Sequence, residues 1–279
     1  MGARQELPPV VDREWLGAHR ASVVVADVRW YSDGRSAAHS YRDGHIPGAV
    51  RVDLDRALAA APSDSAGRHP LPPPGDFARS MAAAGIGDGD VVVGCDDAGG
   101  VIAARLVWML RATGHDAALL DGGVGAWPGP LERGERTRAP ASFSARPWPE
   151  ELLASIDDVA SPPDGTVVVD ARPRDRFEGA PDALDPRAGH IPGARSLPCR
   201  EQLDASGALL ARDEIVAHAA AVGIRAGTAV IATCGSGVTA CHDLLVLEWA
   251  GVGRGRLFPG SWSQWSRDAS RAVATGPDR

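Results

Sequence analysis

Short apolar runs alternate with longer amphipathic stretches along most of the chain. The runs at Val23–Val28, Val167–Val169 and Thr228–Ala232 have the length and the β-branched content of buried strands. A helical pattern of apolar positions then runs from Leu244 to Trp249. This alternation predicts an α/β fold in which mostly parallel sheets are covered by helices on both faces.

The sequence GHIPGA occurs twice, at residues 44–49 and 189–194. Each copy follows an apolar strand that ends in Asp-x-Arg, at 27–29 and at 170–172. A repeat on this scale indicates two duplicated domains rather than a solenoid. Because the Asp-x-Arg pair is present in both halves, we interpret it as a structural ion pair and not as part of a catalytic site.

A length of 279 residues also suits two domains. We expect a first domain at residues 1–132, a proline-rich linker at 133–150 and a second domain at 151–279. A gapless alignment of the two halves places Asp97 where the second half has Cys234. We therefore expect the first domain to be inactive.

Cys234 opens the run CGSGVTAC, which lies between a predicted strand and a predicted helix. Glycine-containing loops at such a junction direct several backbone N–H groups into one concavity, and the helix dipole adds positive potential there. That field favours a thiolate, so Cys234 is the predicted nucleophile. The alternative interpretation is a buried structural cysteine.

Composition narrows the chemistry further. The chain contains no lysine, which excludes a Schiff base, pyridoxal phosphate attachment and a Walker-type phosphate loop. A net charge of −7 gives no reason to expect nucleic acid or a membrane as partner. Four cysteines without CxxC spacing suit a reducing compartment and indicate neither disulfides nor a metal site. Because no export signal is visible, we expect a cytoplasmic protein. We also expect that the protein needs no cofactor.

These motifs, together with PGSWSQW at 259–265, resemble those of the tandem rhodanese-domain sulfurtransferases, in particular the 3-mercaptopyruvate/thiosulfate sulfurtransferase group. The resemblance covers nearly the whole chain. It implies two rhodanese-like domains, with the nucleophile only in the second. The implied activity moves a sulfane sulfur from 3-mercaptopyruvate or thiosulfate, through a persulfide on Cys234, to cyanide or to a thiol acceptor such as a small thiol or a thioredoxin-like protein. The loop resembles that of 3-mercaptopyruvate enzymes, because it lacks the basic residues of thiosulfate-preferring members.

The resemblance also implies site residues. Ser236, His69 and Asp55 match a proton relay, and Arg176 matches a substrate-binding arginine, while the role of Arg187 is open. The other expected substrate-binding residues belong to the loop after the cysteine: Gly235, Gly237, Val238 and Thr239.

Three other interpretations compete with this one. The first is a thiosulfate-specific sulfurtransferase. The second is a cysteine phosphatase of related fold, but such enzymes need Cys-x5-Arg and position 240 is alanine. The third is a non-catalytic binding or sulfur-carrier module. For His69 alone, a solvated loop histidine is the alternative to a catalytic role.

Overall fold

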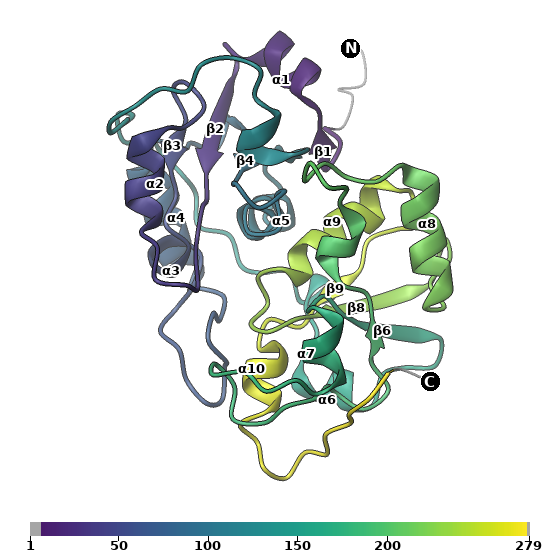
Figure 1. Ribbon diagram of the computed structural model, residues 1–279. Coiled ribbons are helices and arrows are strands. Elements are labelled where there is room, and N and C mark those ends of the chain that lie inside the picture. The colour runs from purple at the N-terminus through teal and green to yellow at the C-terminus, as the bar shows by residue number, and fades with distance from the viewer. Residues whose placement is uncertain (1–6, 278–279) are drawn as a thin grey trace.

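The computed structural model describes residues 7–277 and contains one parallel sheet in each half of the chain (Figure 1). The first sheet has five strands in the order β1-β5-β4-β2-β3, and the second has four in the order β7-β6-β8-β9. Every strand pair is parallel, as the alternating pattern predicts. The strands are β1 (Val10–Val11), β2 (Val23–Asp27), β3 (Val50–Arg51), β4 (Val91–Cys95), β5 (Ala117–Leu120), β6 (Thr166–Asp170), β7 (Arg195–Ser196), β8 (Ala229–Thr233) and β9 (Arg256–Leu257).

Helices and short 3-10 turns connect these strands. In the first half they are α1 (Arg13–His19), α2 (Ala37–Asp43), α3 (Leu54–Ala57), α4 (Pro74–Ala83), α5 (Ala104–Ala112) and η1 (Gly123–Ala126). In the second half they are η2 (Glu150–Leu152), α6 (Ile156–Ala160), α7 (Arg174–Glu178), η3 (Cys199–Gln202), α8 (Arg212–Ala221), α9 (Ala240–Trp249) and α10 (Ser261–Trp265).

Both faces of each sheet are buried. Along β2, Val24 belongs to one apolar cluster and its neighbour Val25 to another. Along β6, Val169 and Val168 separate in the same way. Since successive strand residues point to opposite faces, apolar packing on both faces explains why these strands read as continuous valine runs.

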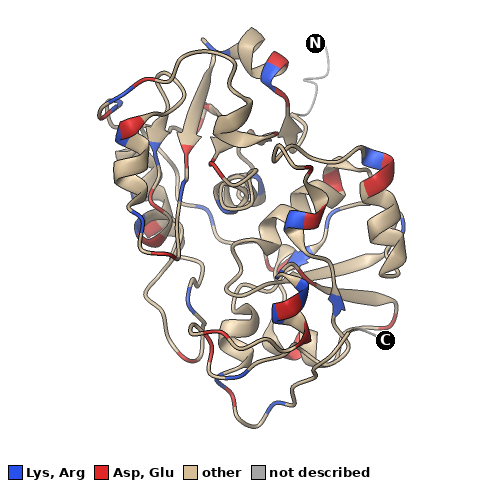
Figure 2. Cartoon of the chain, viewed as in Figure 1, with Lys and Arg blue, Asp and Glu red and all other residues tan. Residues whose placement is uncertain are grey.

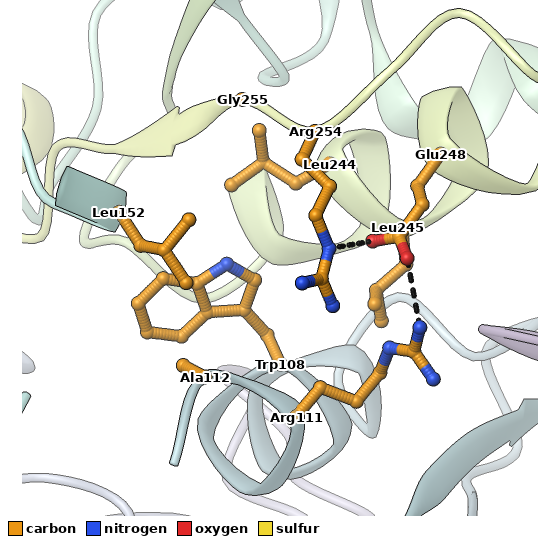
Figure 3. A pocket seen from close by; sticks show the side chains of 9 residues that line it. All are labelled: Trp108, Arg111, Ala112, Leu152, Leu244, Leu245, Glu248, Arg254 and Gly255. Carbon is orange, nitrogen blue, oxygen red and sulfur yellow. Dashed lines mark hydrogen bonds and ion pairs between the residues drawn. The ribbon is translucent and has the colours of Figure 1, made fainter. Parts of the chain in front are cut away.

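The inner faces of the two sheets share a single apolar core. Helices α5 and α9 lie side by side at its centre (Figure 1). At the rim of this contact, Glu248 of α9 accepts hydrogen bonds from Arg111 of α5 at 2.7 Å and from Arg254 at 3.1 Å (Figure 3). The domains are therefore packed as one body, in which elements of one half can complete a site in the other.

The predicted Asp-x-Arg ion pair forms in both halves. Arg29 pairs with Asp27 at 2.6 Å, and Arg172 pairs with Asp170 at 2.7 Å. Each guanidinium also donates to the carbonyl of the first glycine of the following GHIPGA motif. The strands end at the aspartate, two residues before the arginine, because the arginine turns out of the ladder to make these bonds.

No helix or strand occupies residues 128–149, as the prolines predict. Glu132 still pairs with His45 of the first half through an isolated bridge. We keep the division at 132/133 and 150/151 as our proposal; the chain ends that it includes, residues 1–6 and 278–279, lie outside the described residues. Between residues 7 and 277, no helix combines the length and the apolar character needed to cross a membrane.

Candidate active site

Cys234 is the first residue after β8, at the carboxyl end of the second sheet, where parallel α/β folds place their sites. Its side chain is buried, with 1% of the residue exposed. The Gly237 N–H lies 3.1 Å from the Cys234 Sγ. The Cys234 N–H donates to the Ser261 hydroxyl at 3.1 Å, and its carbonyl accepts from the Trp262 N–H at 3.0 Å, so α10 fixes the backbone of the cysteine.

The loop turns tightly at Gly237, which has φ +75°. A Cβ at this position would lie 2.5 Å from the Pro259 carbonyl oxygen, so only glycine fits. The amides of Cys241 and His242 donate to the carbonyls of Val238 and Thr239 at the start of α9. Of the predicted amide cradle, the Gly237 N–H lies within hydrogen-bonding distance of the sulfur.

A chain of hydrogen bonds joins Ser236, His69 and Asp55. Ser236 Oγ lies 2.7 Å from His69 Nδ1, and His69 Nε2 lies 3.2 Å from Asp55 Oδ1. Because a carboxylate only accepts, Nε2 carries the proton and the neutral ring accepts the serine O–H at Nδ1. The sequence placed these residues in different halves of the chain, and the structure brings them together beside Cys234.

Burial sets the charge of His69. Desolvation lowers its pKa to about 4, although the Asp55 carboxylate opposes that shift. Trp30 supports the arrangement, since its indole N–H donates to Asp55 Oδ2 at 3.1 Å and its ring packs edge-on to His69. The histidine is thus neutral near pH 7 and accepts a hydrogen bond from the Ser236 hydroxyl at Nδ1.

In the first half, Asp96 stands where the second half has Cys234. The strand register pairs Asp27 with Cys95 and Asp170 with Thr233, so the next residues, Asp96 and Cys234, are equivalent. The sequence alignment, which matched Asp97 to Cys234, is therefore displaced by one residue. Residues 96–103 separate β4 from α5, whereas only residues 234–239 separate β8 from α9, so no gapless alignment fits both ends of the loop.

The buried Asp96 carboxylate fills its own amide cradle. It accepts four backbone N–H groups at 2.7–2.8 Å, from Ala98, Gly100, Ile102 and Ala103. Burial raises the pKa of Asp96, and these amides oppose the rise. The first half keeps the anion-binding loop but has a carboxylate in place of a sulfur nucleophile.

Known proteins share this architecture. A family profile described as a rhodanese-like domain matches residues 12–129 and again residues 149–268. The chain belongs to the rhodanese family. Both halves of this tandem rhodanese protein carry the fold. The residue directly after the central strand is a cysteine, Cys234, in the second half and an aspartate, Asp96, in the first.

Full-length relatives support the assignment. A Pseudomonas aeruginosa protein provisionally named 3-mercaptopyruvate sulfurtransferase is 38% identical, over 91% of this chain and 93% of its own. A Mycobacterium tuberculosis protein with the provisional name thiosulfate sulfurtransferase SseB is 35% identical, over 91% of each chain. The crystal structure of SseA from Escherichia coli is 34% identical, with a TM-score of 0.80 over 92% of this chain and 99% of that chain.

Two arginines absent from the sequence prediction contribute to the rhodanese site. The guanidinium of Arg105, on α5, is fully buried and donates to the carbonyls of Gly237 at 2.8 Å and His69 at 3.0 Å. Arg68 Nη2 lies 3.1 Å from where a Cβ on Gly235 would be. The sequence did offer a signal for Arg105, because an arginine within the otherwise apolar residues 102–110 indicates a buried cation. Nothing in the sequence indicated that Arg68 reaches the loop.

Arg176 and Arg187 have different roles. Arg176 lies at the end of α7 and pairs with Asp182. Arg187 donates to four backbone carbonyls of the C-terminal segment, those of Trp265, Ser266, Asp268 and Arg271, at 2.6–2.8 Å. These bonds use the guanidinium of Arg187 to hold the segment after α10, so its role is structural.

The other cysteines are poor nucleophiles. Burial raises the pKa of Cys241 to about 12 and the pKa of both Cys95 and Cys199 well above the ordinary value. All four cysteines are free thiols. Figure 2 shows that acidic and basic residues are interspersed along the loops around the lower end of the second domain.

We predict that Gly237→Ala lowers sulfur transfer on the order of a hundredfold, because a displaced loop moves the amide and the sulfur away from the reacting geometry. Gly223→Ala is the matched control: Gly223 has φ +89° but no atom within 4 Å of an added Cβ. That variant should lose only about 1 kcal/mol of stability. Comparable activity losses in both, measured by steady-state kinetics and urea unfolding, would contradict the role given to the loop.

We predict a pH-dependent stability effect at His69. Its folded-state pKa of about 4 lies below the ordinary 6.5, so the unfolded chain binds more protons between these values. The native state therefore loses stability as pH falls from about 7 to 4.5, by roughly 2 kcal/mol from this group. In urea unfolding, wild type should lose this amount relative to His69→Gln, which does not titrate. A constant difference between the two proteins at both pH values would refute the buried neutral histidine.

Proposed function

We propose that this rhodanese protein transfers a sulfane sulfur from 3-mercaptopyruvate, through a persulfide on Cys234, to a thiol acceptor. The observation that carries the proposal is the position of the Cys234 sulfur, beside the Gly237 amide and the hydrogen-bonded chain of Ser236, His69 and Asp55. The names of full-length relatives support the same reaction class.

In the first half-reaction, the Cys234 thiolate attacks the donor sulfur and an S–S bond forms. The donor C–S bond breaks, and its electron pair leaves with pyruvate as the enolate. The Ser236 hydroxyl is placed to hydrogen-bond the developing enolate oxygen, with His69 and Asp55 behind it. Protonation of the enolate carbon then gives pyruvate, and the Gly237 amide stabilises the anionic persulfide.

In the second half-reaction, an acceptor thiolate attacks the outer sulfur. The S–S bond of the enzyme breaks, and Cys234 leaves as a thiolate, which restores the starting state. A small thiol, a thioredoxin-like protein or cyanide could serve as acceptor by this chemistry. Four free thiols are consistent with a cytoplasmic location, which we propose on that ground.

Arg176 and Arg68 are the proposed binding groups for the donor anion. Planar guanidinium groups hold a carboxylate bidentately, and Arg68 brings one to the edge of the Cys loop next to Gly235. The absence of cations within the loop therefore does not by itself reject thiosulfate. Thiosulfate is the second candidate donor, because two guanidinium groups could neutralise its two charges.

The other functional interpretations lack a supporting observation. In a phosphatase, the arginine of Cys-x5-Arg would follow the loop, but α9 begins there with Ala240. Arg105 does reach the loop, but its guanidinium is committed to carbonyl oxygens. A purely non-catalytic module would not require a hydrogen-bonded relay beside the cysteine.

We predict that wild-type protein treated with 3-mercaptopyruvate gains the mass of one sulfur atom and that Cys234→Ser does not. A hydroxyl cannot form a persulfide, and the change is nearly isosteric. Cys241→Ser is the control, because Cys241 is buried seven residues away with a pKa of about 12 and should not carry the sulfur. Intact-mass spectrometry decides: a sulfur adduct that persists in Cys234→Ser would exclude Cys234 as the carrier.

A further inference from the structure

The Cys234 sulfur is closed to a donor in this structure. Cys234 is 1% exposed and Ser236 is 8% exposed. The first half-reaction requires contact between the donor sulfur and Sγ, so a group that covers the loop has to move. Arg68 is the side chain that lies over Gly235, the residue next to the cysteine.

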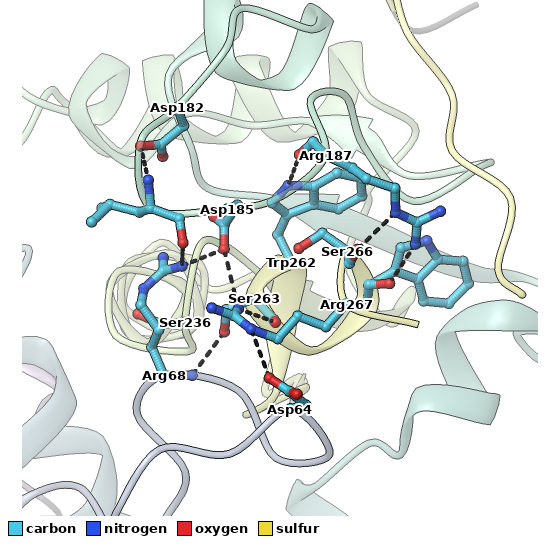
Figure 4. Close-up of polar contacts among 12 residues, drawn as sticks. Asp64, Arg68, Asp182, Asp185, Arg187, Ser236, Trp262, Ser263, Ser266 and Arg267 are labelled. Atoms are coloured by element: carbon cyan, nitrogen blue, oxygen red, sulfur yellow. Dashed lines mark hydrogen bonds and ion pairs between the residues drawn. The ribbon is translucent and has the colours of Figure 1, made fainter. Parts of the chain in front are cut away.

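Both arginines proposed to bind the donor are already paired with carboxylates, and these carboxylates lie close together in one segment. Arg176 pairs with Asp182, and Arg68 pairs with Asp185. Figure 4 shows Asp182 and Asp185 approaching from the segment after α7, with Arg68 directed at Asp185. Arg68 also donates to the Leu184 carbonyl at 3.2 Å, which binds it to the backbone of the same segment.

Asp185 is a buried carboxylate whose hydrogen bonding is incomplete. Its side chain is 1% exposed, and its Oδ1 lies near both Arg68 and Arg267, the latter at 3.7 Å. Its other oxygen, Oδ2, has no hydrogen-bond partner among residues 7–277. A partly satisfied buried ion pair is less stable than a complete one, so an incoming carboxylate can compete for the same guanidinium.

An open groove of about 610 Å³ borders this ion pair. Its lining includes Leu184, Asp185, Arg187 and Arg267. Arg68 reaches the groove through its partner Asp185, so a small anion there would meet Asp185 and the guanidinium of Arg267 beside the ion pair. Arg187 is held by four carbonyls, whereas Arg68 and Arg267 both face Asp185 and can exchange partners.

We propose that Asp182 and Asp185 are specificity-determining residues that occupy the donor-binding arginines as internal counter-ions. A donor that presents its own carboxylate replaces them at Arg176 and Arg68, the segment 182–185 moves away, and the sulfur becomes accessible. A neutral sulfur donor cannot make this exchange and is excluded. No covalent bond changes in this step. The inference rests on the proposed function, because it specifies which donors reach the same cysteine.

The test uses Asp185→Asn and Asp182→Asn in the full chain, with Asp76→Asn as matched control. Asp76 is exposed on α4 and pairs with Arg79, so its loss changes the net charge equally without freeing Arg68 or Arg176. The first readout is the rate at which iodoacetamide, a neutral reagent, alkylates Cys234, followed by intact mass. Cys234→Ser identifies the adduct.

We expect alkylation to be about tenfold faster in Asp185→Asn and Asp182→Asn than in wild type, the change expected for loss of one charge-assisted pair. Asp76→Asn should match wild type. In Asp185→Asn and Asp182→Asn, the KM for 3-mercaptopyruvate should fall several-fold, because the donor no longer competes with a carboxylate. The kcat of both variants should stay within about twofold of the wild-type value.

Alkylation at the wild-type rate in both Asp185→Asn and Asp182→Asn would overturn the proposal. A raised KM would also overturn it, since the aspartates would then support donor binding instead of opposing it. Should Asp185→Asn fail to give a cooperative thermal transition, Asp182→Asn alone decides by the same criteria. Alkylation does not require sulfur transfer. A faster rate without persulfide formation would therefore contradict the proposed function and leave the counter-ion role standing.

Discussion

The buried Arg105 guanidinium is the interaction on which the site depends. It lies on α5 of the first domain and bonds to the carbonyls of His69 and Gly237, so one cation fixes the relay and the Cys loop at once. Longer contacts of 3.4 Å reach the Leu58 carbonyl. Burying a charge is costly unless its donors are satisfied, and the Gly237 carbonyl contributes to that compensation only when the domains are packed together. The first domain is thus part of the active site although its own cradle holds Asp96.

Duplication explains how one domain could keep the nucleophile while the other contributes supporting residues to the same site. The same strand end and loop provide an anion cradle twice, and a carboxylate fills one while a sulfur lies in the other. A carboxylate in the first cradle satisfies the loop amides permanently. The segment between α3 and α4 of that domain, which includes His69, instead extends to the second domain. The loop after β4 therefore has a structural role, and the equivalent loop after β8 holds the predicted nucleophile.

Local pattern predicted much of this structure, and long-range contacts account for what it missed. The valine runs, the GHIPGA repeats and the prolines of 128–149 gave the parallel sheets, the duplication and the irregular connection. Cys234 was predicted from the loop pattern and the relay of Ser236, His69 and Asp55 from resemblance. The structure places these three relay residues within hydrogen-bonding distance of one another. Arg68 and Arg105 were missed because their role depends on how the two domains pack, which no spacing along the chain encodes. The Asp97 assignment failed because only the strand register reveals the longer first loop.

The first domain completes the active site through Arg105, whose guanidinium binds the Gly237 carbonyl of the Cys loop. The most direct measurement is the single-turnover rate of persulfide formation in Arg105→Gln, with Arg111→Gln as control, since Arg111 joins the same helix to Glu248 away from the cysteine. We expect a loss of at least about tenfold in Arg105→Gln beyond any loss in the control, at matched folded fraction. Equal rates in the two variants would contradict it.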